Sequence, residues 1–356
     1  MRIVISTGGT GGHIFPALQT ASVLRERGHQ VVFIGSLGLG EEKVRSEGFD
    51  VTVLNAKGLT SKSFTGLCSF ALLMLQAIIK SLKNLRKIRP DKVIGFGGYG
   101  SFAVVLAARL LNIPTMIHEQ NVVPGKANRF LAKCVKRIAI SFPETRAHLQ
   151  GDRTVWTGCP CHQQPSRLDR EAIIRKYALE ANRQTILVLG GSQGSQRLNE
   201  IVHEVIAAWS APIAIQLVLM TGKKEYAAYA GKYKDSHVPV KVFEFINPIE
   251  EAYAIADVVI ARSGAATVSE LGYFAIPSIF IPYPLADGHQ KYNAQILSSM
   301  GLAQIIEQKE LTTARLTDAL SAVLTAKFDK DQWRQKTTGL FKEDPAKELA
   351  VAIENL

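Results

Sequence analysis

The sequence predicts an α/β fold made of two doubly wound, Rossmann-like domains, each built on a mostly parallel sheet. A short apolar segment, Ile3-Val4-Ile5, leads into the glycine-rich stretch 6–13, and an amphipathic segment follows at about 16–27. The same order of strand, glycine turn and helix recurs at 185–199. Strand-like and helical segments alternate along most of the 356 residues, a length typical of two domains.

Apolar runs and helical periodicity predict the individual elements. In the first half we expect strands at 2–6, 30–35, 50–54, 92–95, 114–118 and 137–140, and helices at about 16–27, 40–48, 69–88, 101–111 and 124–133. In the second half we expect strands at 185–189, 214–220, 240–245, 256–260 and 278–282, the last of which should complete the sheet, with a helix from about 199 and only helices over 311–356. A polar stretch at 163–182 marks the boundary. We therefore predict domains at 1–158 and 159–340, with a C-terminal helix at 341–356 that packs back on the first domain.

The charge of the chain is unevenly distributed. Residues 1–158 contain 21 Lys and Arg against 9 Asp and Glu, the remainder contains 21 against 22, and the formal net charge is +11. The basic half should therefore face something anionic, such as lipid head groups, pyrophosphate or nucleic acid. We expect no nucleic-acid partner, because basic and aromatic residues do not interleave in this half.

The cysteines are typical of a reducing compartment. Four cysteines form no disulfide framework, and no signal peptide precedes the first strand, so we expect a cytoplasmic protein. Cys159-Pro160-Cys161-His162 resembles half of a metal site, but no second cluster completes it. We therefore expect neither a metal nor another cofactor.

The first glycine loop, Gly8-Gly9-Thr10-Gly11-Gly12-His13, is predicted to hold an anion. Glycines let a backbone approach a ligand closely, and a loop at a helix N-terminus offers free N–H groups and the positive end of the helix dipole. The loop does not fit the dinucleotide fingerprint, because Ile14 replaces a glycine and the second strand ends in Gly35-Ser36 rather than in an acid. A tight turn without a ligand is the alternative.

Two further loops in the first half follow expected strands. Gly97-Gly98-Tyr99 and His118-Glu119-Gln120-Asn121 should converge with the first loop, because the carboxyl ends of parallel strands meet at one edge of a sheet. Glu119 and Asn121 are candidates to hold sugar hydroxyls. A plain turn is the alternative for each loop.

The second half contains an anion loop of its own. Gly190-Gly191-Ser192-Gln193-Gly194 and the helix start at 263–267 are candidates to face a pyrophosphate. Glu270 has two oxygens that could bridge ribose hydroxyls, and Gln290 has both a donor and an acceptor for a sugar. The alternatives are a helix-dipole partner for Glu270 and an exposed N-terminal helix position for Gln290.

The predicted helix at 69–88 belongs to a segment with an uncharged first part and a basic second part. Residues 63–79 carry no charge over 17 positions, and Lys80, Lys83, Arg86, Lys87 and Arg89 follow. This span is shorter than the roughly 20 apolar residues that cross a bilayer. The one-sided charge favours docking on an anionic membrane surface. A buried core helix with a solvated basic end is the alternative.

In order along the chain, the motifs at 8–13, 118–121 and 190–194 and Arg262-Ser263-Gly264-Ala265 with Glu270 resemble the MurG family of bacterial peptidoglycan synthesis. The similarity covers essentially the whole chain with matching spacing. It implies a GT-B fold, in which the two domains face an interdomain cleft. It also implies inverting, metal-free transfer of N-acetylglucosamine from UDP to the muramyl 4-hydroxyl of undecaprenyl-pyrophosphoryl-muramyl-pentapeptide, at the cytoplasmic face of the bacterial membrane.

The resemblance assigns residues to both substrates. Implied donor contacts are Thr10, Gly11, Gly12, His13, Asn121, Ser192, Ile246, Ala265, Ala266, Thr267, Glu270 and Gln290. Implied acceptor contacts are Gly9, Thr10, Gly97, Gly98 and Tyr99, with the helix at 64–89 on an anionic membrane surface. A neutral imidazole at His13 is a candidate to take the proton of the attacking hydroxyl, and Glu119 is the rival base.

Two motifs depart from the family pattern. The linker Gly158-Cys159-Pro160-Cys161-His162 replaces the usual Gly-Asn-Pro-Val-Arg, so His162 stands where an arginine near the donor phosphates is expected. The second glycine loop continues as Gly100-Ser101-Phe102-Ala103 instead of x-Ser-Gly-Pro. Alternatives within the same fold class are a UDP-sugar 2-epimerase, which the apolar and basic helix disfavours, and a glycosyltransferase with another lipid acceptor, such as diacylglycerol.

Overall fold

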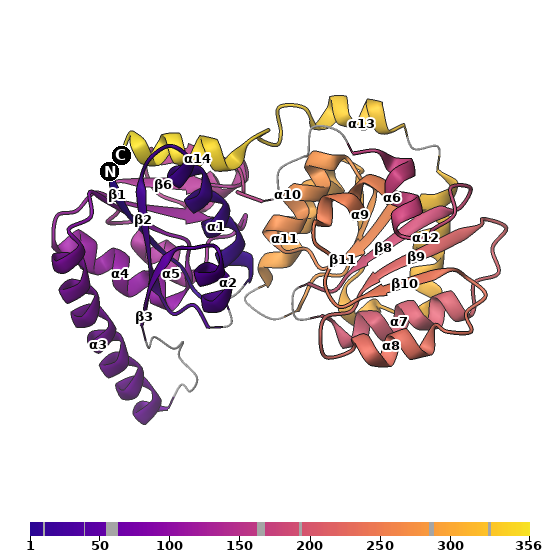
Figure 1. Cartoon of the computed structure of the whole chain (residues 1–356), viewed down its shortest axis with the longest axis horizontal. Coiled ribbons are helices and arrows are strands. Elements are labelled where there is room, and N and C mark those ends of the chain that lie inside the picture. The colour runs from indigo at the N-terminus through magenta and orange to yellow at the C-terminus, as the bar shows by residue number, and fades with distance from the viewer. Residues whose placement is uncertain are drawn as a thin grey trace. The chain divides into compact units, whose positions relative to one another are not determined.

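The computed structural model describes residues 1–9, 11–38, 40–54, 63–161, 168–191, 194–284, 288–326 and 329–356. The chain divides into two compact units (Figure 1). Unit 1 comprises Met1–Cys161 and Lys342–Leu356, and unit 2 comprises His162–Phe341. Both contain a wholly parallel sheet, which confirms the prediction of two doubly wound α/β domains.

Unit 1 is built on a seven-stranded sheet in the order β3-β2-β1-β4-β5-β6-β7. Its strands are β1 (Arg2–Ser6), β2 (Gln30–Gly35), β3 (Asp50–Val53), β4 (Lys92–Gly95), β5 (Thr115–Glu119), β6 (Arg137–Ile140) and β7 (Thr154–Trp156). Its helices are α1 (Gly11–Glu26), α2 (Gly40–Ser46), α3 (Phe64–Ile88), α4 (Gly98–Leu110), α5 (Lys126–Leu131), the 3₁₀ helix η1 (Pro143–His148) and α14 (Pro345–Glu354). The strand order reverses between β1 and β4, and in such sheets ligands bind beyond the carboxyl ends of the strands at this point.

Strand β1 is buried on both faces. Ile3 and Ile5 pack in one cluster with α1 and α14, whereas Val4 packs in another with α4 and the end of α3. All three side chains have 0% exposure, and full burial of such a side chain stabilises the fold by about 1.5–3 kcal/mol. Figure 1 shows α14, in yellow, beside α1 and close to the N-terminus. Leu349 and Ile353 of α14 belong to the same core cluster as α1.

Unit 2 is built on a six-stranded sheet in the order β10-β9-β8-β11-β12-β13. Its strands are β8 (Gln184–Leu189), β9 (Ile215–Met220), β10 (Val240–Phe243), β11 (Val258–Ala261), β12 (Ser278–Phe280) and β13 (Ala303–Ile305). Its helices are α6 (Arg170–Lys176), α7 (Gln196–Ala207), α8 (Tyr226–Lys232), α9 (Ile249–Ile255), α10 (Ala265–Phe274), α11 (His289–Ser299), η3 (Gln308–Glu310), α12 (Thr313–Thr325) and α13 (Lys330–Thr337). Here the strand order reverses between β8 and β11.

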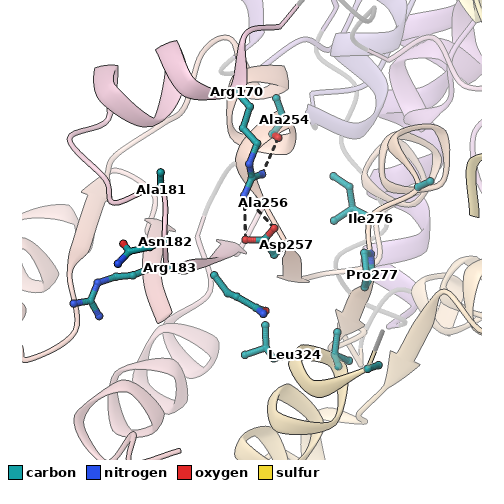
Figure 2. Close-up of a pocket in the computed structure, with 14 residues that line it drawn as sticks. Arg170, Ala181, Asn182, Arg183, Ala254, Ala256, Asp257, Ile276, Pro277 and Leu324 are labelled. Carbon is teal, nitrogen blue, oxygen red and sulfur yellow. Dashed lines mark hydrogen bonds and ion pairs between the residues drawn. The ribbon is translucent and has the colours of Figure 1, made fainter. Parts of the chain in front are cut away.

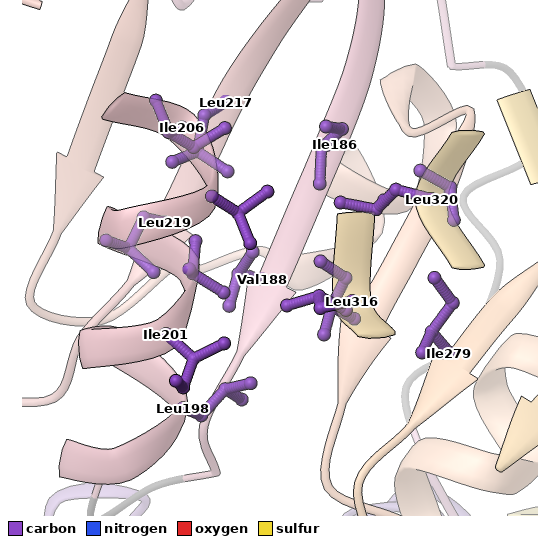
Figure 3. Close-up of a cluster of buried hydrophobic side chains, with 14 of the residues drawn as sticks. Ile186, Val188, Leu198, Ile201, Ile206, Leu217, Leu219, Ile279, Leu316 and Leu320 are labelled. Atoms are coloured by element: carbon purple, nitrogen blue, oxygen red, sulfur yellow. The ribbon is translucent and has the colours of Figure 1, made fainter. Parts of the chain in front are cut away.

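The core of unit 2 lies against the central strand β8. Ile186 and Val188 point between α7 on one side and α12 on the other (Figure 3). Leu198 of α7 and Leu316 of α12 belong to the same buried cluster. The two helices therefore cover the same face of this sheet and hold β8 and its following loop in place.

Two predicted boundaries are wrong in ways that matter. The sheet of unit 2 does not end with β12, because β13 (Ala303–Ile305) pairs with it; this edge strand has only three residues and gives no apolar run. Helix α1 begins at Gly11 rather than near Pro16. The N–H groups of a first helical turn have no partner within the helix, so two glycines can begin it, and Pro16 forfeits only the bond to the Gly12 carbonyl.

Candidate active site

The loops that follow β1, β2 and β4 touch one another through their backbones. A Cβ on Gly98 would lie 2.8 Å from the Cα of Gly8, and one on Gly100 would lie 2.5 Å from the nitrogen of Ser36. Gly8 also forms an isolated β-bridge with Ser36. Gly98 has a φ of +83°, which favours glycine. Three glycine contacts thus bring the predicted loops together, and Ser36 belongs to a third loop that the sequence analysis missed.

His13 lies in the first turn of α1. It faces the glycine cluster, which is formed by Gly8, Gly97 and Gly98. A Cβ on Gly97 would lie 3.0 Å from its Nε2, and one on Gly8 would lie 3.6 Å from its Nδ1. Burial lowers the pKa of His13 to about 4. The imidazole is therefore neutral at physiological pH and can accept a proton.

Glu119 organises the loop that follows β5. Its Oε1 accepts hydrogen bonds from the Asn121 backbone (2.9 Å) and side chain (3.3 Å), and its Oε2 accepts from the Gly125 backbone (3.2 Å) and Asn128 Nδ2 (2.8 Å). Burial raises the pKa of Glu119, although these bonds favour the charged form. Both oxygens of Glu119 are therefore hydrogen-bonded within its own loop, where Glu119 holds Asn121 in position. This geometry favours His13 over Glu119 as the base.

Two neighbours of Glu119 have contacts that the sequence analysis did not consider. His118 Nε2 lies 3.0 Å from the Gly158 carbonyl oxygen, and its Nδ1 lies 3.2 Å from Gln120 Nε2. Both side chains are buried. Burial lowers the pKa of His118 to about 4, with a smaller lowering from the charge of His13. The motif 118–121 therefore supplies a second neutral imidazole near His13.

The first loop of unit 2 requires glycine. Gly191 and Gly194 have φ angles of +88° and +74°. A Cβ on Gly194 would lie 2.2 Å from the Thr221 carbonyl oxygen. Helix α7 begins directly after this loop, at Gln196. The predicted site residues Ser192, Thr10 and His162 lie outside the described residues.

Helix α10 begins beside this loop, because β8 and β11 are neighbours in the sheet. Its N-cap, Gly264, has no side chain with which to cap the first N–H groups of the helix, those of Ala265, Ala266 and Thr267. Glu270 is buried in the second turn, and its Oε2 accepts a 2.5 Å hydrogen bond from the Tyr253 hydroxyl. Tyr253 was missed because nothing in the sequence links it to Glu270.

Gln290 connects two loops of unit 2. Its Oε1 accepts a hydrogen bond from the Tyr283 backbone (2.9 Å), and its carbonyl oxygen accepts one from Ser263 Oγ (2.8 Å). Gln290 is therefore held at the edge where α10 begins. Ile246 is 3% exposed, whereas the adjacent Phe245 is 52% exposed, so the segment that follows β10 presents an aromatic ring to solvent.

Arg262 is the main functional candidate that the sequence analysis left without a role. Its guanidinium donates to the Ile281 carbonyl (2.9 Å), to Ser195 Oγ (2.8 Å) and to Gln308 Oε1 (2.7 Å). These partners are neutral, and within the described part of the chain no carboxylate pairs with it. Burial lowers the pKa of Arg262. A half-buried cation among neutral partners at this sheet edge attracts an anion.

A pocket of about 540 Å³ lies at the amino ends of the unit 2 strands, where β8, β11 and β12 begin (Figure 2). Arg170 donates to the Ile255 carbonyl (2.8 Å) and to Asp257 Oδ1 (3.1 Å) within it. Its charge is therefore already paired. Ligands of this fold class bind at the carboxyl ends of the strands, so this pocket is separate from the candidate site.

The cysteine motif at the linker is partly described. Cys159 is buried and Cys161 is half-buried. In the described ranges no group of three or more His, Cys, Asp and Glu side chains could hold a metal ion.

Comparisons with known proteins cover both units. The glycosyltransferase family 28 N-terminal domain matches residues 3–140, and the glycosyltransferase family 28 C-terminal domain matches residues 185–349. A protein of Thermodesulfovibrio yellowstonii is 36% identical over 91% of this chain and 90% of its own length, and one of Cupriavidus necator is 36% identical over 99% and 98%. Both are named UDP-N-acetylglucosamine–N-acetylmuramyl-(pentapeptide) pyrophosphoryl-undecaprenol N-acetylglucosamine transferase. The crystal structure of Acinetobacter baumannii MurG is 26% identical with a TM-score of 0.79 over 100% of this chain and 99% of that one, in agreement with the expected GT-B fold.

Proposed function

Because the chain belongs to glycosyltransferase family 28, and within it to the MurG family, we propose that it transfers N-acetylglucosamine from UDP-N-acetylglucosamine to the muramyl 4-hydroxyl of undecaprenyl-pyrophosphoryl-muramyl-pentapeptide. The observation that carries this proposal is the near full-length similarity to transferases of this name. The geometry supports it, since each unit has a glycine-lined loop at the switch point of its sheet.

The proposed reaction needs a base and a stabilised leaving group. The acceptor hydroxyl loses its proton to the neutral imidazole of His13 while its oxygen forms a bond to the anomeric carbon. The bond from that carbon to the UDP oxygen breaks on the opposite face, and UDP leaves with the electron pair. Because the two bonds are on opposite faces, the configuration inverts. Backbone N–H groups at the start of α10 and the guanidinium of Arg262 would stabilise the charge that develops on the diphosphate.

The remaining donor contacts follow from the predicted positions. Glu270, held by Tyr253, would accept the ribose hydroxyls, and the backbone of Ile246 would face uracil. Gln290 and Asn121 would hold the N-acetylglucosamine, and Ser192 with Ala265, Ala266 and Thr267 would face the diphosphate. Thr10, Gly11 and Gly12 would complete the donor site beside His13.

The acceptor pyrophosphate would bind the glycine cluster of unit 1. Gly9, Thr10, Gly97, Gly98 and Tyr99 are the proposed contacts. The support is the close backbone approach of Gly8 and Gly98, which have no Cβ to cover the backbone and lie close to the first turns of α1 and α4.

We also propose that α3 docks unit 1 on an anionic membrane surface. Leu72, Leu75 and Ile79 are 57%, 54% and 44% exposed, and Lys83 and Arg86 continue the same helical face. These five residues form the α3 stripe. The apolar window of the helix is only 11% buried, which does not fit the alternative of a buried core helix.

The geometry of α3 favours lying on the bilayer over crossing it. Ala77, Ser81 and Leu85 are buried, and the second half of the helix packs on α4 (Figure 1). An apolar stripe beside basic residues matches the interface between acyl chains and anionic head groups. The enzyme would then meet its lipid-linked acceptor at the cytoplasmic face of the membrane.

A transfer assay tests the reaction. The chain is incubated with radiolabelled UDP-N-acetylglucosamine and lipid-linked muramyl-pentapeptide, with parallel samples that contain diacylglycerol or no acceptor. Label in the lipid-linked disaccharide supports the proposal. Label on diacylglycerol would show another acceptor, and a changed sugar nucleotide without acceptor would show an epimerase.

Vesicle flotation tests the membrane surface. We expect the protein to float with vesicles that contain anionic phospholipid, and the variants Ile79→Glu and Lys83→Glu to float less. Val351→Glu is the matched control, because Val351 is a 42% exposed apolar residue on α14. Equal flotation of all variants would contradict the role of the α3 stripe.

A further inference from the structure

A buried amide beside the candidate site has a fixed orientation. Gln120 Nε2 lies 3.0 Å from the Phe96 carbonyl oxygen and 3.2 Å from His118 Nδ1. A carbonyl oxygen only accepts hydrogen bonds, so the amide nitrogen must face Phe96. Gln120 Oε1 is buried without a hydrogen-bond partner among the described residues, and turning the amide over would set two oxygens against each other.

This orientation determines the tautomer of His118. Because Gln120 donates, His118 Nδ1 must accept, and the ring proton resides on Nε2. That proton is donated to the Gly158 carbonyl oxygen at 3.0 Å. Both nitrogens of a ring with 0% exposure are therefore used by the neutral form.

His118 and His13 lie beside consecutive residues of the segment that follows β4. The ring of His118 packs on Phe96, with centroids 5.3 Å apart, and His13 contacts the next residue, Gly97. The titratable group whose charge acts on His118 is His13 on α1. Glu119 follows His118 on the same strand, so its side chain points to the other face, and both of its oxygens are bound by the 121–128 loop. A second positive charge at His118 would oppose the uptake of a proton by His13.

We propose that Gln120 is a positioning residue that locks His118 in its neutral Nε2–H tautomer, so that the site holds one cation, and not two, when His13 takes the proton of the acceptor hydroxyl. This inference rests on the proposed role of His13. The proton passes from the hydroxyl to His13 alone, and His118 neither gains nor loses one. Burial lowers the pKa of His118 to about 4, which supports the neutral state, while the bond to Gly158 raises it.

The tautomer is read without any activity measurement. Long-range ¹H–¹⁵N correlation spectra of the full chain, labelled at histidine nitrogens, distinguish protonated from unprotonated ring nitrogens. The signals of His118 among the eight histidines are those that His118→Gln removes. We expect an unprotonated Nδ1 and a protonated Nε2 through neutral pH. A protonated Nδ1 in the parent chain would overturn the lock even if the chain proves to have no transferase activity.

The consequence for turnover is tested with Gln120→Glu, which replaces the donor by a carboxylate, and with Gln120→Met, which removes it. Gln150→Glu is the charge-matched control at an exposed position of unit 1. In Gln120→Glu we expect His118 to carry both protons at neutral pH. The kcat profile should then gain an acidic limb set by His118, at higher pH than the limb set by His13. We expect kcat at neutral pH to fall about tenfold or more, a part of the roughly 10²–10⁴-fold supplied by a placed base.

The two Gln120 variants separate a lock from a packing role. Gln120→Met should lose kcat without the shift in pH profile, because it brings no charge. A pH profile of Gln120→Glu that matches Gln150→Glu would overturn the proposal, and so would a KM increase for UDP-N-acetylglucosamine at unchanged kcat. If Gln120→Glu does not fold, the tautomer of His118 in the parent and the kcat of Gln120→Met test the proposal. Unchanged turnover in Gln120→Met would overturn the proposed role of Gln120.

Discussion

The imidazole of His13 lies beside Gly97, at the place that a side chain on Gly97 would occupy. A Cβ on Gly97 would lie 3.0 Å from His13 Nε2, and Gly97 has a φ of +96°. Gly97→Ala should therefore push the imidazole away from the glycine cluster. It should also add backbone strain of about 1–3 kcal/mol, because φ +96° with ψ 175° is a conformation that is essentially limited to glycine. We expect kcat to fall by an order of magnitude or more, measured in the transfer assay, together with a lower Tm.

The matched control for this variant is Gly28→Ala. Gly28 has a φ of +83°, but an added Cβ would meet nothing within 4 Å. It should lower Tm by a similar amount and leave turnover unchanged. Equal kcat losses in both variants would mean that the loss at Gly97 comes from strain and not from His13.

His13→Ala should lower kcat by roughly 10²–10⁴-fold, the usual contribution of a general base. Burial lowers the pKa of His13 to about 4, so the basic form is present above this pH and is lost as the pH falls through it. We expect kcat of the parent to show no limb near pH 6.5, the ordinary value for histidine. A pH series of initial rates measures this.

Two results would argue against His13 as the base. One is a fall in kcat around neutral pH in the parent that is absent from His13→Ala, while kcat of the two proteins is equal at higher pH. The other is near-full turnover of His13→Ala. The exposed His148, replaced by alanine, serves as the control for loss of a histidine in unit 1.

The sequence predicted those parts of the site that depend on local pattern. Apolar runs such as Ile3-Val4-Ile5 followed by glycines located the loops at the switch points, because a buried strand and a glycine turn are both visible in single segments. The one-sided charge favoured an exposed α3 stripe, but the apolar face alone could not decide between this and a core helix, since an apolar helix face looks the same whether it meets a core or solvent. The edge strand β13 was missed because three residues carry too little pattern.

The roles of individual polar groups depended on distant partners. Glu119 was a candidate to hold sugar hydroxyls and to act as the base, but Asn128, nine positions later, donates a hydrogen bond to one of its oxygens. The contacts of Arg262 come from Ser195 before α7, Ile281 after β12 and Gln308 of η3. No spacing rule connects such positions, because the sheet order brings them together.

Tyr253→Phe should weaken donor binding. The Tyr253 hydroxyl is 2.5 Å from Glu270 Oε2, and hydrogen bonds to charged groups contribute about 1.5–3 kcal/mol. Without it, Glu270 is less well placed for the ribose, and we expect the KM for UDP-N-acetylglucosamine to rise about tenfold with a smaller change in kcat. Tyr226→Phe, which removes a hydroxyl from a 39% exposed ring, should change neither constant. A kcat loss at constant KM would contradict a ribose role for Glu270.

Glu354 joins the C-terminal helix to the opposite end of the chain in unit 1. It accepts two hydrogen bonds from Arg27, at 2.8 and 2.7 Å, and one from His29 at 2.7 Å. These bonds lower the pKa of Glu354 to about 2. The folded pKa is below the unfolded one, so the stabilisation is fully present above the unfolded pKa and is lost as the pH falls through about 2.

Glu354→Gln should therefore lower Tm at neutral pH, by the equivalent of about 0.5–1 kcal/mol after allowance for solvent screening of the exposed Arg27. The difference from the parent should shrink as the pH falls below the unfolded pKa, and thermal unfolding at a series of pH values measures it. Glu348→Gln is the control on the same helix, because Glu348 has only a 3.8 Å ion pair with Lys342 and is 52% exposed. A Tm difference that stays constant down to pH 3 would show that Glu354 acts through packing, because the charge would then make no contribution to the docking of α14.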